Sequence, residues 1–452
     1  MQFVSTRGGS EPVGFFDAFA NGLAPDGGLY VPKNLPLLPS DLLVDDALPY
    51  PALAWDVLGL FDSDHDSDHL IELIDKSYGD FSDTMSAPLQ QIADNLFVLE
   101  LFHGPTLSFK DFGLQLIGNL FEEQIARTGQ TINVLGATSG DTGSAAIHGL
   151  AGKKGVNVFV LYPKGRISKL QELQMTCTGA DNIFPIAIEG SFDDGQAIVK
   201  ELMGDLAVKE NLHLSAINSI NIVRVLAQAV YYVHAYMQLP PENRDDVNFV
   251  VPTGNFGNIF AGWMIHQMGL PVDEFVVATN QNDILYRLFN TGEYSPESVN
   301  PSLAPSMDIQ VASNFERFLY YHNEKNADAT LSQMAEFMSS GSIKVPNFNA
   351  SNFSASMSTD EDIIANIKRV KEEYNYIVDP HTACGFQDID SSKTHIVLAT
   401  AHPAKFPEVM KQALGEAPTD DSLEALKNKK PVSYEVEATP DAVKKFIEDH
   451  KA

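Results

Sequence analysis

Apolar runs alternate with glycine-bearing loops and amphipathic stretches through the middle of the chain, from about residue 95 to residue 280. Short runs rich in valine, isoleucine and leucine are typical of buried strands, and apolar residues three and four apart are typical of the helices that cover them. The predicted strands are residues 133–137, 156–162, 182–188, 248–251 and 274–278. This alternation predicts an α/β fold of right-handed βαβ units on parallel sheets, with ligands at the carboxyl ends of the strands.

The pattern changes on both sides of this region and predicts three parts. They are an amino-terminal subdomain of short elements with Gly/Pro turns (1–90), a central region (91–420) and a charged helical tail (421–452). Within the central region, residues 290–360 are rich in Asn, Ser and Pro, which predicts an irregular insertion with a helix near residues 312–321. The chain then returns to a helix and to a strand at residues 395–399.

Three predicted junctions between a strand or turn and a helix carry candidate chemistry. Lys110 follows a Gly/Pro turn, in the sequence HGPTLSFKDFG (103–113), at the start of a helix predicted near Asp111. A lysine in this position can hold its amine in a cleft where a carbonyl cofactor reaches it. Two further loops, TSGDTG (138–143) and TGNFGN (253–258), each follow an apolar run and precede a helical pattern. Together the three junctions favour a single anion-binding active site.

The two glycine loops allow different uses. In residues 253–258 the glycines let successive N–H groups point at one phosphate, and a helix predicted from about Ile259 adds its positive end. The alternative is an ordinary turn between a strand and a helix. Residues 139–143 offer hydroxyl and N–H groups to a carboxylate or a second phosphate, or alternatively a helix cap. Arg224, inside an apolar helical run, is either a buried cation that awaits an anion or a surface arginine.

The charge and the cysteine content exclude several classes of partner. The chain of 452 residues has a net charge of −30, which opposes binding to nucleic acid and to acidic membranes. A phosphate site must therefore depend on local donors. No apolar run reaches the ~18 residues of a membrane span, and the amino terminus lacks a targeting pattern, so a soluble cytoplasmic protein is expected. Two distant cysteines, Cys177 and Cys384, predict neither a disulfide framework nor a cysteine zinc site.

No metal site is expected. The acidic stretch of residues 62–69 resembles a calcium loop, but Ser67 and Leu73 stand where that loop requires glycine and glutamate, so a solvated loop or a helix start is predicted. His148, His234 and His266 lack partners at metal-site spacing and are expected to be packed or exposed.

Beyond these features, the motifs resemble threonine synthase, of the fold-type II class of pyridoxal-phosphate enzymes. The shared motifs span nearly the whole chain: STRG (5–8), GLAPDGGLYVP (22–32), HGPTLSFKDFG (103–113), GATSGDTG (136–143), PTGNFGN (252–258), DPHTA (379–383) and TAHPAKF (400–406). The amino-terminal and TAHPAKF motifs are narrower in occurrence than the lysine and phosphate loops. The resemblance implies two interwoven parallel-sheet α/β lobes within residues 91–420, after the amino-terminal subdomain.

The resemblance also implies an activity and the residues that carry it. The reaction is conversion of O-phospho-L-homoserine and water to L-threonine and phosphate, the last step of threonine biosynthesis, through a Schiff base of pyridoxal 5'-phosphate on Lys110. The implied cofactor-binding residues are Lys110, Gly254, Asn255, Phe256, Gly257, Asn258 and Thr400, the last on the pyridine nitrogen. The implied substrate-binding residues are Ser139, Thr142, Asn218, Ser219 and Arg224.

Asp141 receives no role, because an ionised carboxylate cannot donate the hydrogen bond that asparagine gives at this place in many relatives. Two alternatives stay open: a serine/threonine dehydratase or related β-replacement enzyme of the same cofactor class, and an inactive metabolite-binding relative. Whether the chain is a monomer or a homodimer is also open.

Overall fold

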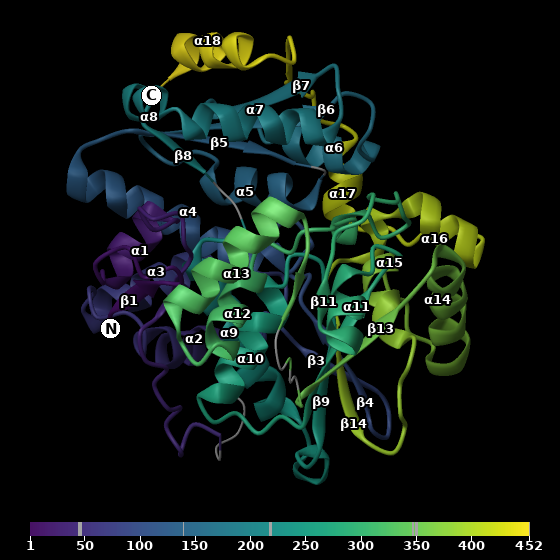
Figure 1. Cartoon of the computed structure of the whole chain (residues 1–452). Coiled ribbons are helices and arrows are strands. Elements are labelled where there is room, and N and C mark those ends of the chain that lie inside the picture. Colours follow the sequence, from purple (N-terminus) through teal and green to yellow (C-terminus); the bar gives the residue numbers. More distant parts are fainter. Residues whose placement is uncertain (44–47, 139, 217–218, 346–347, 349–350, 452) are drawn as a thin grey trace. The chain divides into compact units, whose positions relative to one another are not determined.

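The computed structural model describes residues 1–43, 48–138, 140–216, 219–345, 348 and 351–451 (Figure 1). The chain forms two compact units, and each combines two separate segments. The first unit contains Met1–His103 and Ser219–Ala417, and the second contains Gly104–Asn218 and Pro418–Ala452. Since the chain leaves and re-enters each unit, the two α/β lobes are interwoven, as expected.

A mostly parallel sheet forms the centre of the first unit. Its strands run in the order β13 (Phe353–Met357), β10 (Glu274–Thr279), β9 (Val247–Pro252), β14 (Thr394–Ala399), β4 (Leu96–Glu100) and β3 (Leu89–Ala93). Only β3 pairs antiparallel among these described strands. β9 and β14 are adjacent and buried along their whole length, which explains their continuous apolar sequences.

Helices cover both faces of this sheet because successive side chains of each strand point to opposite faces. Val250 and Val397 join the core cluster that includes Ile363 of α14 (Asp360–Tyr374) and Met410 of α16 (Pro407–Leu414). On β9 the neighbouring Phe249 instead contacts a tyrosine of α9 (Ile222–Gln238), which packs on α10 (Gly257–Gln267). The loops before α10 and after β14 therefore meet at one edge, the carboxyl end of the sheet.

Smaller elements complete the first unit. They are β1 (Phe3–Ser5), α1 (Phe15–Asn21), β2 (Tyr30–Pro32), α2 (Tyr50–Gly59), α3 (Ser67–Tyr78), η1 (Pro241–Asn243), α11 (Ile284–Thr291), β11 (Glu293–Tyr294), η2 (Pro305–Met307), α12 (Phe315–His322), α13 (Ala327–Ser340), β12 (Ile343–Lys344), α15 (Pro380–Ala383), η3 (Cys384–Phe386) and η4 (Pro403–Lys405). Asp66 caps α3 by accepting from the His69 N–H, so the calcium-like stretch ends in a helix start, one of the two predicted alternatives.

The second unit has a fully parallel sheet. Its described strands run in the order β15 (Tyr434–Val436), β7 (Ile183–Ile188), β6 (Val156–Pro163), β5 (Ile132–Ala137) and β8 (Leu214–Ala216). Its helices are α4 (Lys110–Thr128), α5 (Asp141–Leu150), α6 (Lys169–Thr176), α7 (Phe192–Gly204), α8 (Leu206–Asn211), α17 (Asp421–Leu426) and α18 (Pro440–His450). Figure 1 shows α7 and α18 on one face of this sheet and α5 on the other. The carboxyl-terminal segment thus supplies an edge strand, β15, that its charged sequence did not indicate.

The six strands predicted from the sequence are confirmed to within one residue at each end. The insertion at 290–360 is more regular than predicted, because it contains α13, a helix of 14 residues. Asn326 begins this helix by accepting from the Ala329 N–H, and Gly341 ends it in the left-handed conformation. Few of its side chains are buried, so the helix lacks the apolar stripe that marks one in a sequence. No helix within the described ranges is long and apolar enough to cross a membrane.

Glycines set the distance between α4 and α5. A Cβ on Gly118 would lie 2.0 Å from the carbonyl oxygen of Gly149, and a Cβ on Gly149 would lie 2.5 Å from that of Leu114. Both distances are shorter than any real contact of a Cβ atom, so only glycine permits this backbone approach. The two helices carry Lys110 and Asp141 at their first positions, and the glycines therefore control how these side chains meet.

We expect Gly118→Ala to lower the free energy of unfolding by about 1–3 kcal/mol, because the new methyl group must push two backbones apart. Urea denaturation followed by circular dichroism measures this change. Gly204→Ala is the matched control, since no atom lies within 4 Å of its Cβ position at the end of α7, and its effect should stay below about 1 kcal/mol. Equal stability of the two variants would show that the close approach is unnecessary.

Candidate active site

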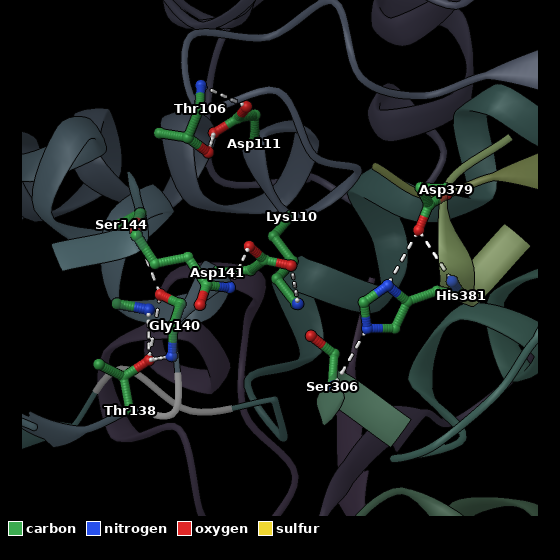
Figure 2. Close-up of polar contacts among 12 residues, drawn as sticks. Thr106, Lys110, Asp111, Thr138, Gly140, Asp141, Ser144, Ser306, Asp379 and His381 are labelled. Carbon is green, nitrogen blue, oxygen red and sulfur yellow. Dashed lines mark hydrogen bonds and ion pairs between the residues drawn. The ribbon is translucent and has the colours of Figure 1, made fainter. Parts of the chain in front are cut away.

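A tight turn places Lys110 at the start of α4 in the second unit. Asp111 holds this turn: its carboxylate accepts from the Thr106 N–H at 2.8 Å and from the Thr106 hydroxyl at 2.7 Å (Figure 2). A Cβ on Gly104 would lie 2.5 Å from the Cβ of Asp111, so the turn requires glycine there. The turn thereby fixes Lys110, whose residue surface is only 9% exposed.

Asp141, the first residue of α5, faces the amine of Lys110. The Lys110 Nζ donates to Asp141 Oδ2 at 3.4 Å (Figure 2), and Asp141 Oδ1 accepts from Gln171 Nε2 at 3.2 Å. The Asp141 side chain is buried. Reasoning from sequence assigns Asp141 no role because a carboxylate cannot donate. In the structure the Asp141 carboxylate accepts a hydrogen bond from the Lys110 amine. A carboxylate acceptor stabilises a protonated amine.

The loop before α5 is organised by Thr138. Its Oγ1 accepts from the N–H groups of Gly140 at 3.0 Å and Gly143 at 2.9 Å, and Ser144 donates to the Gly140 carbonyl at 3.2 Å (Figure 2). Thr138, which lies before residues 139–143, therefore accepts from the first turn of α5, whereas the N-cap residue Gly140 forms no side-chain cap bond. Thr142, a predicted substrate residue, is half-buried in the first turn of α5. Ser139 lies outside the described residues.

Residues 253–258 connect β9 to α10 in the first unit, as the pattern predicted, although α10 begins two residues before Ile259. Phe256 has a φ of +64° and is buried against several phenylalanine rings, which holds the loop in this strained conformation. A Cβ on Gly254 would lie 3.3 Å from both the Ser306 carbonyl oxygen and the Met307 Cα of η2. The loop backbone therefore packs tightly against η2.

The end of this loop carries a buried hydrogen-bond donor, the side-chain amide of Asn258. Asn258, in the first turn of α10, accepts at Oδ1 from the hydroxyls of Tyr231 at 2.6 Å and Tyr232 at 2.9 Å. Its Nδ2 is buried and has no hydrogen-bond partner among the described residues. A buried donor of this kind calls for an acceptor that the protein does not supply, and the positive end of the helix favours an anion.

Asn255 and Ser219, predicted for the cofactor and the substrate, are joined through Ser313. The Ser313 hydroxyl donates to Asn255 Oδ1 at 3.0 Å and lies 2.7 Å from the Ser219 hydroxyl. Asn314 adds a bond from its Nδ2 to the Ser219 carbonyl at 3.0 Å. These contacts bring Ser219 beside the glycine loop. Asn218 lies outside the described residues.

Arg224 is a buried cation, which decides between the two alternatives for this residue. It lies in the first turn of α9 with 4% of its surface exposed, and its Nη1 has no hydrogen-bond partner in the described part of the chain. Burial lowers the pKa of Arg224 to about 10, so the guanidinium is still protonated at neutral pH. A buried charge without a partner is costly and points to an anion that binds there.

Arg317 shows the contrast. It is also fully buried, and burial lowers its pKa to about 9, but all three of its nitrogens have partners. It donates from Nε to the Tyr30 carbonyl at 2.9 Å, from Nη1 to Asn314 Oδ1, and from Nη2 to the Ile220 carbonyl at 2.5 Å. Arg317 is therefore structural, whereas Arg224 is available to a ligand.

Thr400 directly follows β14, as predicted, and is buried at the carboxyl end of the first unit's sheet. Its N–H donates to Thr382 Oγ1 at 3.1 Å. Residues 253–258 are called the Gly254 loop. Because β14 and β9 are adjacent and parallel, Thr400 and the Gly254 loop lie at the same edge, the carboxyl end of the sheet.

Sequence reasoning missed several polar residues around these sites. The role of Gln171 could not be predicted, because no regular spacing along the sequence connects Gln171 with Asp141. Asp379 and His381 stood inside a motif but had no assigned chemistry, and in the structure they are buried and paired at 2.9 Å.

Comparisons with known proteins find relatives that match most of the chain. The family described as pyridoxal-phosphate dependent enzyme matches residues 84–341, more than half of the chain, and those described as threonine synthase N terminus and threonine synthase, C-terminal match residues 2–78 and 381–447. A threonine synthase of Pseudomonas aeruginosa is 43% identical over 92% of this chain and 92% of its own length, and one of Schizosaccharomyces pombe is 41% identical over 92% and 89%.

A solved structure extends the likeness to three dimensions. The crystal structure of threonine synthase from Brucella melitensis with bound pyridoxal phosphate has a TM-score of 0.96 and 39% identity, covering 100% of this chain and 99% of that one. Because this likeness covers the whole chain, the chain has the fold-type II architecture. The chain therefore belongs to the threonine synthase family of pyridoxal-phosphate-dependent enzymes.

Proposed function

We propose that the chain converts O-phospho-L-homoserine and water to L-threonine and inorganic phosphate. The observation that supports this substrate most directly is Arg224, a buried guanidinium whose Nη1 has no partner in the described part of the chain. A phosphorylated substrate would provide the missing anion, and a planar guanidinium can grip a phosphate with two parallel hydrogen bonds.

The first unit has groups that fit the phosphate and the ring of pyridoxal 5'-phosphate. The Nδ2 of Asn258, which has no partner within the described ranges, and the start of α10 suit the phosphate, together with the rest of the loop, Gly254, Asn255, Phe256 and Gly257. Thr400 would present its hydroxyl to the pyridine nitrogen. A neutral hydroxyl there would leave the ring less than fully protonated.

Lys110 would anchor the cofactor covalently. Its amine needs to lose a proton before it acts as a nucleophile, and Asp141, whose Oδ2 lies 3.4 Å from the Lys110 Nζ, is an acceptor for that proton. Gln171 keeps the carboxylate of Asp141 turned toward the amine. This pair gives Asp141 a role that reasoning from sequence left empty.

The remaining chemistry assigns one task to each group. When bound, pyridoxal phosphate supplies an electron sink for the charge left at the substrate Cα. Lys110, once released from its covalent task, would move protons at Cα and Cβ. Arg224 and Ser219 would hold the phosphate as it leaves, and Thr142 would hold the substrate carboxylate or phosphate, with Ser139 and Asn218 proposed from the resemblance alone. Water would then add at Cβ.

Two assays test this proposal against the runner-up, a serine/threonine dehydratase. The purified enzyme, loaded with pyridoxal phosphate, is incubated with O-phospho-L-homoserine, and release of phosphate is measured together with formation of threonine. A parallel reaction with threonine measures 2-keto acid. We expect phosphate and threonine in equal amounts and little keto acid, whereas keto acid alone would reject the proposal. An inactive relative would produce neither. A cytoplasmic location stays a prediction from the sequence.

A further inference from the structure

The motif Asp379–Ala383, which the proposed chemistry does not use, forms a buried polar network in the first unit. Asp379, His381 and Thr382 have at most 3% of their surfaces exposed. His381 Nδ1 donates to Asp379 Oδ1 at 2.9 Å, and the Thr382 hydroxyl donates to Asp379 Oδ2. One carboxylate therefore organises two neighbouring side chains.

The first branch of the network reaches the glycine loop. The Ser306 N–H donates to His381 Nε2 at 3.1 Å (Figure 2). Nε2 must then be unprotonated, so His381 is the neutral tautomer with its proton on Nδ1, facing Asp379. Ser306 belongs to η2, whose backbone is in van der Waals reach of a Cβ on Gly254. His381 thus supports the turn against which the Gly254 loop packs.

The second branch reaches Thr400. Because the Thr382 hydroxyl gives its proton to Asp379, its lone pairs accept the Thr400 N–H at 3.1 Å. Thr400 is the residue whose own hydroxyl lies at the end of β14, at the same edge as the Gly254 loop. Both branches begin at the Asp379 carboxylate and end at the two places where the first unit is proposed to hold the cofactor.

We propose that Asp379 is a positioning residue that holds the Gly254 loop through His381 and the Thr400 backbone through Thr382, and so sets the affinity and the electronic environment of pyridoxal phosphate. The inference rests on the proposed roles of Gly254 and Thr400. Asp379 acts by orientation: because its two oxygens accept from four donors, it fixes the direction of both hydrogen-bond chains.

Thr382→Val tests the second branch, because it removes the hydroxyl and keeps the shape. The equilibrium dissociation constant for pyridoxal phosphate should rise about 10-fold, as expected for loss of one buried hydrogen bond with its partner left unpaired. The long-wavelength absorbance of the bound cofactor, and its dependence on pH, should change as well. Thr382→Ser keeps the hydroxyl and should retain both properties. Asp379→Asn removes the charged acceptor of both branches and should weaken binding by more than Thr382→Val.

Thr330→Val is the matched control. Thr330 is also fully buried, and its hydroxyl also donates one hydrogen bond and accepts one, at α13, outside the network. It should lower thermal stability without changing cofactor affinity or absorbance. Unchanged affinity and spectrum in Thr382→Val would overturn the proposal, and so would an equal loss in Thr382→Ser.

A measurement on the unaltered holoenzyme keeps the proposal testable if a variant fails to fold. Nitrogen-15 NMR of the histidine rings should show His381 protonated at Nδ1 and bare at Nε2. A proton on Nε2 contradicts the Ser306 branch and overturns the proposal. Since these readouts concern cofactor binding and tautomer, they stay informative even if O-phospho-L-homoserine releases no phosphate, which would reject only the proposed reaction.

Discussion

Lys110→Ala should abolish covalent attachment of pyridoxal phosphate and lower kcat by about 10³-fold or more. The amine of Lys110 is held by the turn that Asp111 closes and by the acceptor Asp141, and alanine removes both the nucleophile and the group that moves protons. Borohydride reduction of the loaded enzyme, followed by peptide mass measurement, should locate the pyridoxyl adduct on Lys110 in the unaltered chain. The variant should give no adduct.

Lys153→Ala is the control for this result. Lys153 belongs to the same unit and donates to Asn119 and Glu122 on α4, away from the turn that carries Lys110. Its loss should leave the adduct and kcat nearly unchanged. A reduced adduct that maps to any lysine other than Lys110 would contradict the proposed anchor.

Arg224→Met should lower kcat/KM for O-phospho-L-homoserine by about 10²- to 10³-fold while the absorbance of the bound cofactor stays the same. The buried guanidinium has an Nη1 without a partner among the described residues, so the variant loses the grip on the substrate phosphate and breaks no described hydrogen bond of that nitrogen. Arg224→Lys keeps the charge but loses the two-pronged geometry, and an intermediate decrease is expected. Steady-state kinetics measures both variants.

Stability separates this prediction from a structural role. Removing a buried charge that has no partner in the described part of the chain should leave the free energy of unfolding unchanged or raise it. Arg317→Met should instead lower it by about 3–5 kcal/mol, because three buried neutral acceptors lose their donor. Chemical denaturation of the two variants provides the comparison. A large loss of stability in Arg224→Met, or unaltered kinetics, would place Arg224 outside the substrate site.

The strands and the helix starts of the candidate site were predictable because they depend on local patterns. Buried parallel strands have continuous apolar sequences, and the Gly254 loop carries its own turn and helix signals. Arg224 could not be decided in the same way. The helix α9 is buried on every side, so it has no polar stripe against which the position of one arginine can be judged.

Pairings between distant residues were beyond reach for a different reason. The contact of Lys110 with Asp141 exists because two glycines let α4 and α5 approach, and Gln171 reaches the pair from a third helix. Each of these depends on tertiary packing, which a single sequence does not encode at any fixed spacing. The direction of the Asp379 hydrogen bonds likewise appears only when η2, α15 and the end of β14 are assembled.

The carboxyl-terminal segment has a consequence for synthesis on the ribosome. β15 pairs with β7, and Val443 and Ile447 of α18 cover the apolar surface of α7, yet these residues are translated only after residues 219–417 of the other unit. A nascent chain in which residues 104–218 have already been translated therefore exposes the apolar surface of α7 while some two hundred further residues are translated. Such a surface can bind chaperones or aggregate until α18 has been translated and has packed against it.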